Sequence, residues 1–192
     1  GELKDVDIAI KDKKIQQIGQ ILEEAKEIID ASGHTVLPGC IDTQTHFREP
    51  GSTDTEDLHS GSRAAIVGGI TSVFEMPNTN PPTSNKKEFQ RKLDLAKNRM
   101  YCNYAFYFGA TADNADDLSS LKHLEGCCGI KLFAGSSTGN LLVAEEDDID
   151  RVFQNASKVV AVHSEDEAIL KVNKKLIKKG DVHTHPVWRS AE

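Results

Sequence analysis

Apolar and polar residues follow one pattern before residue 38 and another after it. The first part carries the short alternating stretches VDIAI, KIQQIG and EIIDASGHTVL, which are separated by charged turns and show no helical period. From Pro38 onward, apolar strand-like runs alternate with polar helical runs, the pattern of β/α units around a parallel sheet. We therefore predict a small β-structure over residues 1–37 and a separate β/α region over residues 38–192.

The second region divides into five β/α units. The predicted strands are residues 39–47, 70–77, 101–110, 126–134 and 158–164, and the predicted helices are residues 56–68, 86–99, 114–122, 145–156 and 165–179. An eight-stranded TIM-type (β/α) barrel needs eight such units and about 250 residues, whereas the chain has 192. The predicted fold class is therefore α/β, with the first five units of such a barrel, and we expect about three further units beyond Glu192.

Charge and cysteine content narrow the functional classes. Lys and Arg total 23 and Asp and Glu total 30, giving a net charge of −7 that is spread along the chain. This balance disfavours nucleic acid and anionic membranes as partners. No run approaches the ~18 apolar residues of a membrane span.

Without a C-x-x-C pair, the cysteines are interpreted as buried apolar residues of a cytoplasmic protein: Cys40, Cys102, Cys127 and Cys128.

The first predicted strand of the β/α region ends in a polar cluster. Its sequence is D-T-Q-T-H-F-R-E-P-G, and strand alternation predicts one face for Asp42, Gln44, His46 and Arg48. In a barrel this face points inward, toward the C-terminal mouth where active sites lie. A lone histidine is more often a satisfied core or surface residue. A packed interior, however, does not hold this much polarity without a ligand, a metal or a charge partner, so the context favours a site.

Two later strands carry residues suited to the same site. Lys131 lies in the apolar run G-I-K-L-F, and His163 ends the run V-V-A-V-H. A buried lysine either pairs with a carboxylate or loses its proton, and a neutral amine can form a carbamate with CO₂ that supplies oxygen ligands to Zn²⁺. With His46, these residues occupy equivalent positions on strands one, four and five, the converging arrangement that a metal centre needs. The H-x-H pair at His183 and His185 is interpreted as part of a loop.

Five segments of the chain resemble the dihydroorotase family of cyclic amidohydrolases. They are PGCIDTQTHFREPG, MPNTNPPT, IKLFAGSSTG, VHSED and HPVWRSAE. The resemblance implies reversible hydrolysis of dihydroorotate to N-carbamoyl-aspartate in pyrimidine biosynthesis, by metal-activated hydroxide. It implies one or two Zn²⁺ ions held by His46, by Lys131 as a carbamate and by His163, with Arg48 and Asn78 holding the substrate carboxylate. On local grounds alone, Asn78 could equally be a turn residue. No catalytic residue is assigned in this chain, because the general-base Asp is expected downstream.

One departure from the family pattern leaves alternatives open. The family's first strand reads D-x-H-x-H, and Gln44 stands here at the first histidine position, where an amide is a poorer Zn²⁺ ligand. A hydantoinase or allantoinase on a neutral ring is one alternative, which the carboxylate-binding pair Arg48 and Asn78 opposes. A non-catalytic scaffold subunit is another, which Lys131 and His163 oppose. The expected partners are a small-molecule substrate and, as an open alternative, a second copy in a homodimer.

Overall fold

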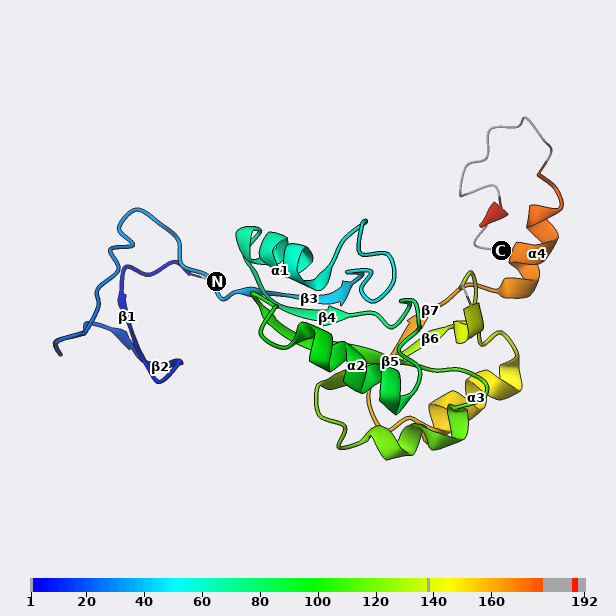
Figure 1. The fold of residues 1–192 in the computed structure, drawn as a ribbon. Coiled ribbons are helices and arrows are strands. Elements are labelled where there is room, and N and C mark those ends of the chain that lie inside the picture. Colours follow the sequence, from blue (N-terminus) through cyan, green and yellow to red (C-terminus); the bar gives the residue numbers. More distant parts are fainter. Residues whose placement is uncertain (1, 138, 178–187, 190–192) are drawn as a thin grey trace. The chain divides into compact units, whose positions relative to one another are not determined.

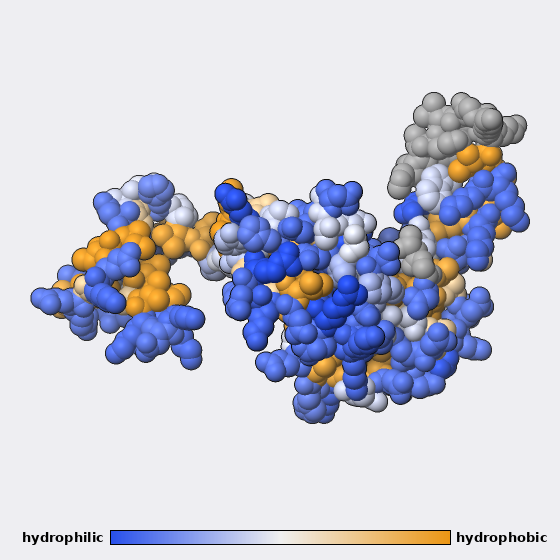
Figure 2. All heavy atoms as spheres, in the orientation of Figure 1, coloured by the Kyte–Doolittle hydropathy of each residue, from blue (hydrophilic) through white to orange (hydrophobic). Residues whose placement is uncertain are grey.

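The computed structural model describes residues 2–137, 139–177 and 188–189, and the chain divides into two compact units, Gly1–Pro38 and Gly39–Glu192. The first unit holds an antiparallel pair, β1 (Asp7–Lys11) and β2 (Lys14–Gly19). Asp12 and Lys13 link the strands with φ of 52° and 63°, as a two-residue hairpin turn of the right twist requires. The predicted β-structure is confirmed for this pair, but EIIDASGHTVL forms no strand. Apolar side chains such as Ile10 and Ile15 remain exposed in this unit (Figure 2).

The second unit is built on five parallel strands in chain order (Figure 1). The strands are β3 (Cys40–Thr45), β4 (Ile70–Glu75), β5 (Asn103–Gly109), β6 (Cys127–Phe133) and β7 (Val160–His163). The connecting and following helices are α1 (Leu58–Val67), α2 (Lys86–Ala96), the 3₁₀ helices η1 (Ala115–Leu121) and η2 (Gly139–Leu141), α3 (Glu146–Asn155) and α4 (Glu167–Lys174). This arrangement confirms the predicted fold, a half-barrel of five parallel strands preceded by an antiparallel β-pair.

Three of the four described α-helices begin where a short polar side chain caps them. Asp57 accepts from the backbone N–H of Ser60 at the start of α1, and Asn85 does the same for Glu88 at the start of α2. The predicted helix over residues 114–122 is wrong in type, because the structure has a 3₁₀ helix there. Asn114 does not cap it and instead donates to the carbonyls of Ser84 and Gly109, and the short Asp and Ser side chains of ADDLSSL compete with helical hydrogen bonds.

The helices cover one face of the sheet and form the core with it. Val73, Phe106 and Ile130 point to this side, where they pack with helical residues that include Phe89 of α2 and Val152 of α3. The ring centroids of Phe89 and Phe106 lie 6.4 Å apart, edge to face. Strand alternation therefore turns their sequence neighbours to the opposite face, which is the interior side of a barrel.

That opposite face is lined by a second set of side chains. Tyr107 lies edge to face with Phe74, with 6.5 Å between the ring centroids. A Cβ atom at Gly129 would approach the Tyr107 ring to 2.8 Å, so only glycine fits beneath it. Lys131 and Phe133 follow Gly129 at two-residue steps along β6 and therefore share this face.

The cysteines are all free thiols, and one of them departs from the expected burial. Cys102 and Cys127 are buried and Cys128 is half-buried, but Cys40 is exposed. Cys40 begins β3, which pairs with β4 alone in the described sheet, so one side of its backbone and side chain stays open. No helix within the described residues has the length and apolar character that crossing a lipid bilayer requires.

Candidate active site

The three predicted metal ligands lie on the face of the sheet that the helices leave open. Phe133 pairs with His163 across β6 and β7, and its ring lies 4.9 Å from the Lys131 Nζ and 6.0 Å from the His163 ring. His46 is flanked by Thr45 and Phe47, which are both buried. Because Phe47 packs against Gly61 of α1 on the helix side, His46 between them points to the other side.

His46 is held by a hydrogen bond from the loop after β4. Its Nδ1 lies 2.9 Å from the Asn78 Oδ1, and an amide oxygen can only accept, so Nδ1 carries the proton. Burial lowers the pKa of His46, the charges of Arg48 and Lys131 lower it further, and the Asn78 hydrogen bond opposes them. A neutral imidazole with an unprotonated Nε2 results, which is the form that binds a metal ion.

Lys131 is nearly inaccessible to water, with only 3% of its surface exposed. Burial lowers the pKa of its ammonium group. Among residues 2–137, 139–177 and 188–189, no carboxylate forms an ion pair with it. The alternative in which a carboxylate neutralises Lys131 therefore finds no support in the described part of the chain.

His163 is held by a carboxylate that the sequence reasoning did not single out. Its Nε2 forms a short contact with Glu165 Oε2, and Arg189 lies 3.1 Å from the other oxygen of Glu165. Arg189 also donates to the hydroxyl of Ser136 in the loop after β6. His163, Glu165 and Arg189 thus form a series of polar contacts that fixes the imidazole ring and leaves its Nδ1 for a ligand. The signal was present in the sequence V-H-S-E-D, where an acidic residue follows the histidine by two.

Arg48 and Asn78, the predicted carboxylate-binding residues, come from two loops that are joined to each other. The backbone N–H of Asn80 donates to the carbonyl of Pro50 at 2.9 Å. Gly51 has a φ of 119°, and a Cβ atom there would approach the Asn80 Cβ to 2.8 Å. The amide oxygen of Asn78 is occupied by His46, so its NH₂ group remains as a donor, and the charge of Arg48 acts on the same His46 ring.

Strand β3 does not alternate regularly up to His46. Asp42 pairs with Val73 and Thr45 pairs with Glu75, so three steps along β3 match two along β4. The expectation that Asp42 shares the face of His46 is therefore wrong, because Asp42 lies beside Val73, which points to the helices. The Gln44 side chain is exposed, and its backbone N–H donates to the Asp42 carboxylate at 2.9 Å.

A buried ion pair lies on the helix side of the same strand ends. Glu75 at the end of β4 contacts the ammonium of Lys92 in α2, and these residues are 1% and 0% exposed. Lys92 also donates to the carbonyl of Met76 at 3.0 Å. Burial raises the pKa of Glu75 to about 7 against the opposing charge of Lys92. Sequence reasoning missed this pair, because its members are 17 positions apart in a strand and a helix that both read as ordinary.

Residues 35–189 match the sequence pattern of the Amidohydrolase family. The chain belongs to the amidohydrolase family. A dihydroorotase of Methanosarcina mazei is 35% identical over 184 residues, which cover 94% of this chain and 40% of that protein. An allantoinase of Escherichia coli O1:K1 is 37% identical over 177 residues, which cover 88% of this chain and 39% of that protein. The chain thus spans about 40% of the length of these curated relatives.

The fold of this amidohydrolase chain is also that of a solved enzyme structure. An L-hydantoinase (dihydropyrimidinase) from Arthrobacter aurescens superimposes with a TM-score of 0.84 at 30% identity, covering 95% of this chain and 42% of that one. Within the described residues, no group of three or more His, Cys, Asp or Glu side chains is arranged to hold a metal ion. The amidohydrolase ligand candidates here are two imidazoles and a lysine, and His183 and His185 lie outside the described residues.

Proposed function

We propose that the protein acts as a dihydroorotase, hydrolysing the cyclic amide of dihydroorotate to N-carbamoyl-aspartate and catalysing the reverse ring closure. The observation that carries the proposal is that Arg48 and Asn78 come from two joined loops and both act on His46, Asn78 by a hydrogen bond that leaves its NH₂ group as a donor and Arg48 by its charge. A guanidinium and an amide donor are suited to a carboxylate. Dihydroorotate carries one on its ring, whereas hydantoin and allantoin rings carry none.

The residues present fit a metal ion of the Zn²⁺ type. His46 offers Nε2 and His163 offers Nδ1, since Asn78 and Glu165 hold the other ring nitrogens. Lys131 is buried without a carboxylate partner among the described residues, which favours the neutral amine that a carbamate requires. A metal ion bound there supplies Lewis-acid chemistry, activating water and polarising an amide carbonyl.

The remaining residues of the proposed site bind and orient the substrate. Arg48 and Asn78 receive the ring carboxylate, which places the scissile amide over the open face of the sheet. The buried neighbours Phe133 and Tyr107 lower the local polarity and strengthen each charge interaction there. We further propose a cytoplasmic protein that takes a small-molecule substrate and is able to form a homodimer.

A second candidate is a hydantoinase or allantoinase acting on a neutral ring. It is supported by the 37% identity to the Escherichia coli allantoinase and by the structural match to the Arthrobacter aurescens L-hydantoinase. A third is a non-catalytic scaffold subunit, supported by Gln44 at a metal-ligand position. The dihydroorotase proposal accounts for Arg48 better than either does.

The deciding experiment compares three substrates on the metal-loaded protein at its natural length. We expect turnover of dihydroorotate and none of hydantoin or allantoin. Arg48→Met should raise the KM for dihydroorotate roughly 10- to 100-fold, as loss of a charge-assisted hydrogen bond does. Arg63→Met, at an exposed position of α1, is the matched control and should leave KM unchanged. Preferred turnover of a neutral ring would establish the second candidate, and inactivity on all three the third.

A further inference from the structure

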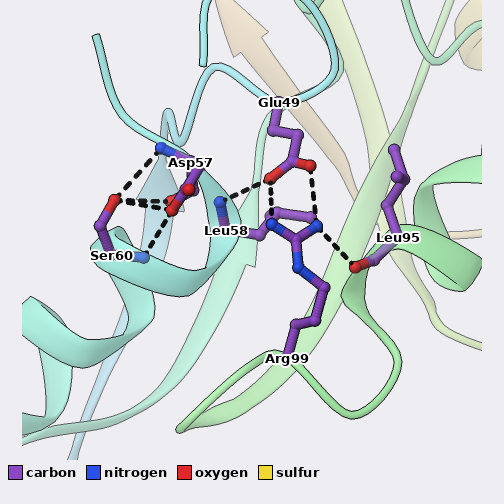
Figure 3. Close-up of polar contacts among 6 residues, drawn as sticks. All are labelled: Glu49, Asp57, Leu58, Ser60, Leu95 and Arg99. Carbon is purple, nitrogen blue, oxygen red and sulfur yellow. Dashed lines mark hydrogen bonds and ion pairs between the residues drawn. The ribbon is translucent and has the colours of Figure 1, made fainter. Parts of the chain in front are cut away.

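Glu49 follows Arg48 in the loop after β3, and its side chain is only 7% exposed. Its Oε2 accepts the backbone N–H of Leu58, in the first turn of α1, at 2.9 Å. The two carboxylate oxygens also accept from the two terminal nitrogens of Arg99, at 2.8 and 3.2 Å (Figure 3). The guanidinium and the carboxylate thus form a forked, charge-assisted pair of fixed geometry.

Arg99 extends this contact to a second helix. The same nitrogen that bonds Glu49 Oε1 also donates to the carbonyl of Leu95, at 3.0 Å, in the last turn of α2 (Figure 3). Glu49 is therefore joined to the start of α1 directly and to the end of α2 through Arg99. In Figure 3, the capping pair Asp57 and Ser60 closes the same first turn of α1, so the turn that receives Glu49 is itself held.

Arg48 needs such support, because its φ of 51° lies in the left-handed region that is unfavourable for a residue with a Cβ atom. Such conformations persist where the neighbouring chain is fixed on both sides. On one side, the Phe47 ring packs against Gly61, where a Cβ atom would come within 2.5 Å. On the other side, Glu49 is bound by Leu58 and Arg99. Site residues and anchoring residues therefore alternate along the chain from His46 to Glu49.

We propose that Glu49 and Arg99 form a positioning pair that holds Arg48 in the geometry needed to receive the substrate carboxylate. The inference rests on the proposed function, since it gives Arg48 that role. It adds that substrate affinity depends on a contact on the helix side of the sheet, at residues that do not touch the substrate. Because the pair acts through Arg48, its loss affects carboxylate binding and leaves the metal ligands in place.

The test is Arg99→Met in the metal-loaded protein at its natural length, with kcat, KM and metal content measured for dihydroorotate. We expect KM to rise about 10- to 100-fold, with kcat and metal content little changed. Arg99→Lys keeps the charge but offers no fork, so its KM should lie between those of Arg99→Met and the native protein. Arg91→Met is the matched control, since Arg91 lies on α2, pairs with Glu88 at the surface and should not alter KM.

A double variant separates positioning from general destabilisation. In an Arg48→Met background, Arg99→Met should add little to the rise in KM, because the residue through which it acts is gone. If Arg48→Met raises KM while Arg99→Met and Arg99→Lys both leave it unchanged, the positioning inference fails and the proposed function stands. If Arg48→Met itself leaves KM unchanged, both fail. Additive effects of the two substitutions would also overturn the inference.

Discussion

Lys131 is buried and has no carboxylate partner among the described residues, unlike an ordinary lysine. Burial lowers the pKa of its ammonium group, so the neutral amine becomes available at a lower pH than for an exposed lysine. The amine nitrogen can then bond to the carbon of CO₂ with release of a proton. We therefore expect bicarbonate to tighten Zn²⁺ binding in the native protein, increasingly as pH rises through the lowered pKa.

Isothermal titration with and without bicarbonate checks this prediction. Lys131→Met should abolish the bicarbonate effect and weaken Zn²⁺ binding by about 10-fold or more. Lys122→Met, at an exposed position, should behave as the native protein. A bicarbonate effect that survives Lys131→Met would show that the carbamate does not form there. In a crystal of the metal-loaded protein, density beyond the lysine nitrogen is the direct observation.

Gln44 bears on the number of metal ions. Its exposed side chain lies two residues before His46, at the position where the family pattern has its first histidine. A neutral amide is a weaker Zn²⁺ ligand than imidazole, so we expect one tightly bound ion and a second bound loosely. Gln44→His should strengthen the weaker position about 10- to 100-fold in a metal titration. Unchanged stoichiometry and affinity would place Gln44 outside the ligand sphere.

The candidate metal ligands could be predicted from the sequence, but the residues that hold them in place could not. His46, Lys131 and His163 could be chosen because a polar residue within or at the end of an apolar run is conspicuous, and alternation assigns its face. Glu165, Arg189 and the pair Glu75–Lys92 become visible only through contacts between distant segments. The irregular pairing of β3, which moves Asp42 to the other face, likewise leaves no mark in the sequence.

At the scale of elements, the buried ion pair of Lys92 and Glu75 joins α2 to β4. Lys92→Met leaves the Glu75 carboxylate buried without its partner, and we expect a loss of about 3–5 kcal/mol in the free energy of unfolding at pH 8. The pKa of Glu75 is about 7 in the folded protein against 4.5 as its ordinary value. Because its pKa is raised on folding, Glu75 stabilises the folded protein at pH values below 4.5. This stabilisation is lost as the pH rises through about 7.

The loss in free energy of unfolding that Lys92→Met causes should therefore be smaller at pH 5 and grow toward pH 8, because Glu75 takes up a proton at the lower pH. Urea denaturation at the two pH values measures it. Lys87→Met, at an exposed position of the same helix, should show neither the loss nor the pH dependence. An equal loss in free energy of unfolding at pH 5 and pH 8 would show that the pH dependence does not come from Glu75.

Helix α1 packs against the segment after β3 at Gly61, where the absence of a side chain leaves room for the Phe47 ring. Gly61→Ala gains helix propensity worth up to about 1 kcal/mol, but the new Cβ atom lies 2.5 Å from the body of the ring. Overpacking of this kind costs about 1–3 kcal/mol, so the net effect should be destabilising by about 1 kcal/mol. Gly68→Ala at the end of the same helix is the control, since its Cβ atom would have 3.4 Å of clearance. Thermal unfolding that ranks the two variants in the reverse order would contradict this packing argument.

The order and type of most elements could be predicted, because apolar runs and capping residues are local signals. All five parallel strands lie within the predicted segments, and α1, α2 and α3 begin within two residues of the expected positions. The missing cap of the 3₁₀ helix η1 could not be foreseen, because the Asn114 side chain bonds to Ser84, 30 positions away. EIIDASGHTVL alternates as a strand does but has no pairing partner among the described residues of its unit.

At the scale of the whole molecule, the five-stranded unit places its two imidazole candidates on its first and last strands. His46 directly follows β3 and His163 ends β7, with three strands between them. Adjacent strands lie about 4.8 Å apart, so in a flat sheet the two outer strands would be about 19 Å apart. Two groups that share one ion must come within about 4 Å of each other. Only a strongly curled sheet can close this gap.

The curl of the sheet and the affinity for an ion are therefore coupled by thermodynamic linkage. An ion that bridges the two outer strands stabilises the curled form, by about 2.7 kcal/mol when its concentration is 100 times its dissociation constant. Conversely, a substitution that flattens the sheet weakens ion binding without touching any ligand. Gly129, over which the Tyr107 ring lies at the concave side, is such a position. A bulkier residue at Gly129 would flatten the sheet, and the affinity for the ion would fall although no ligand is changed.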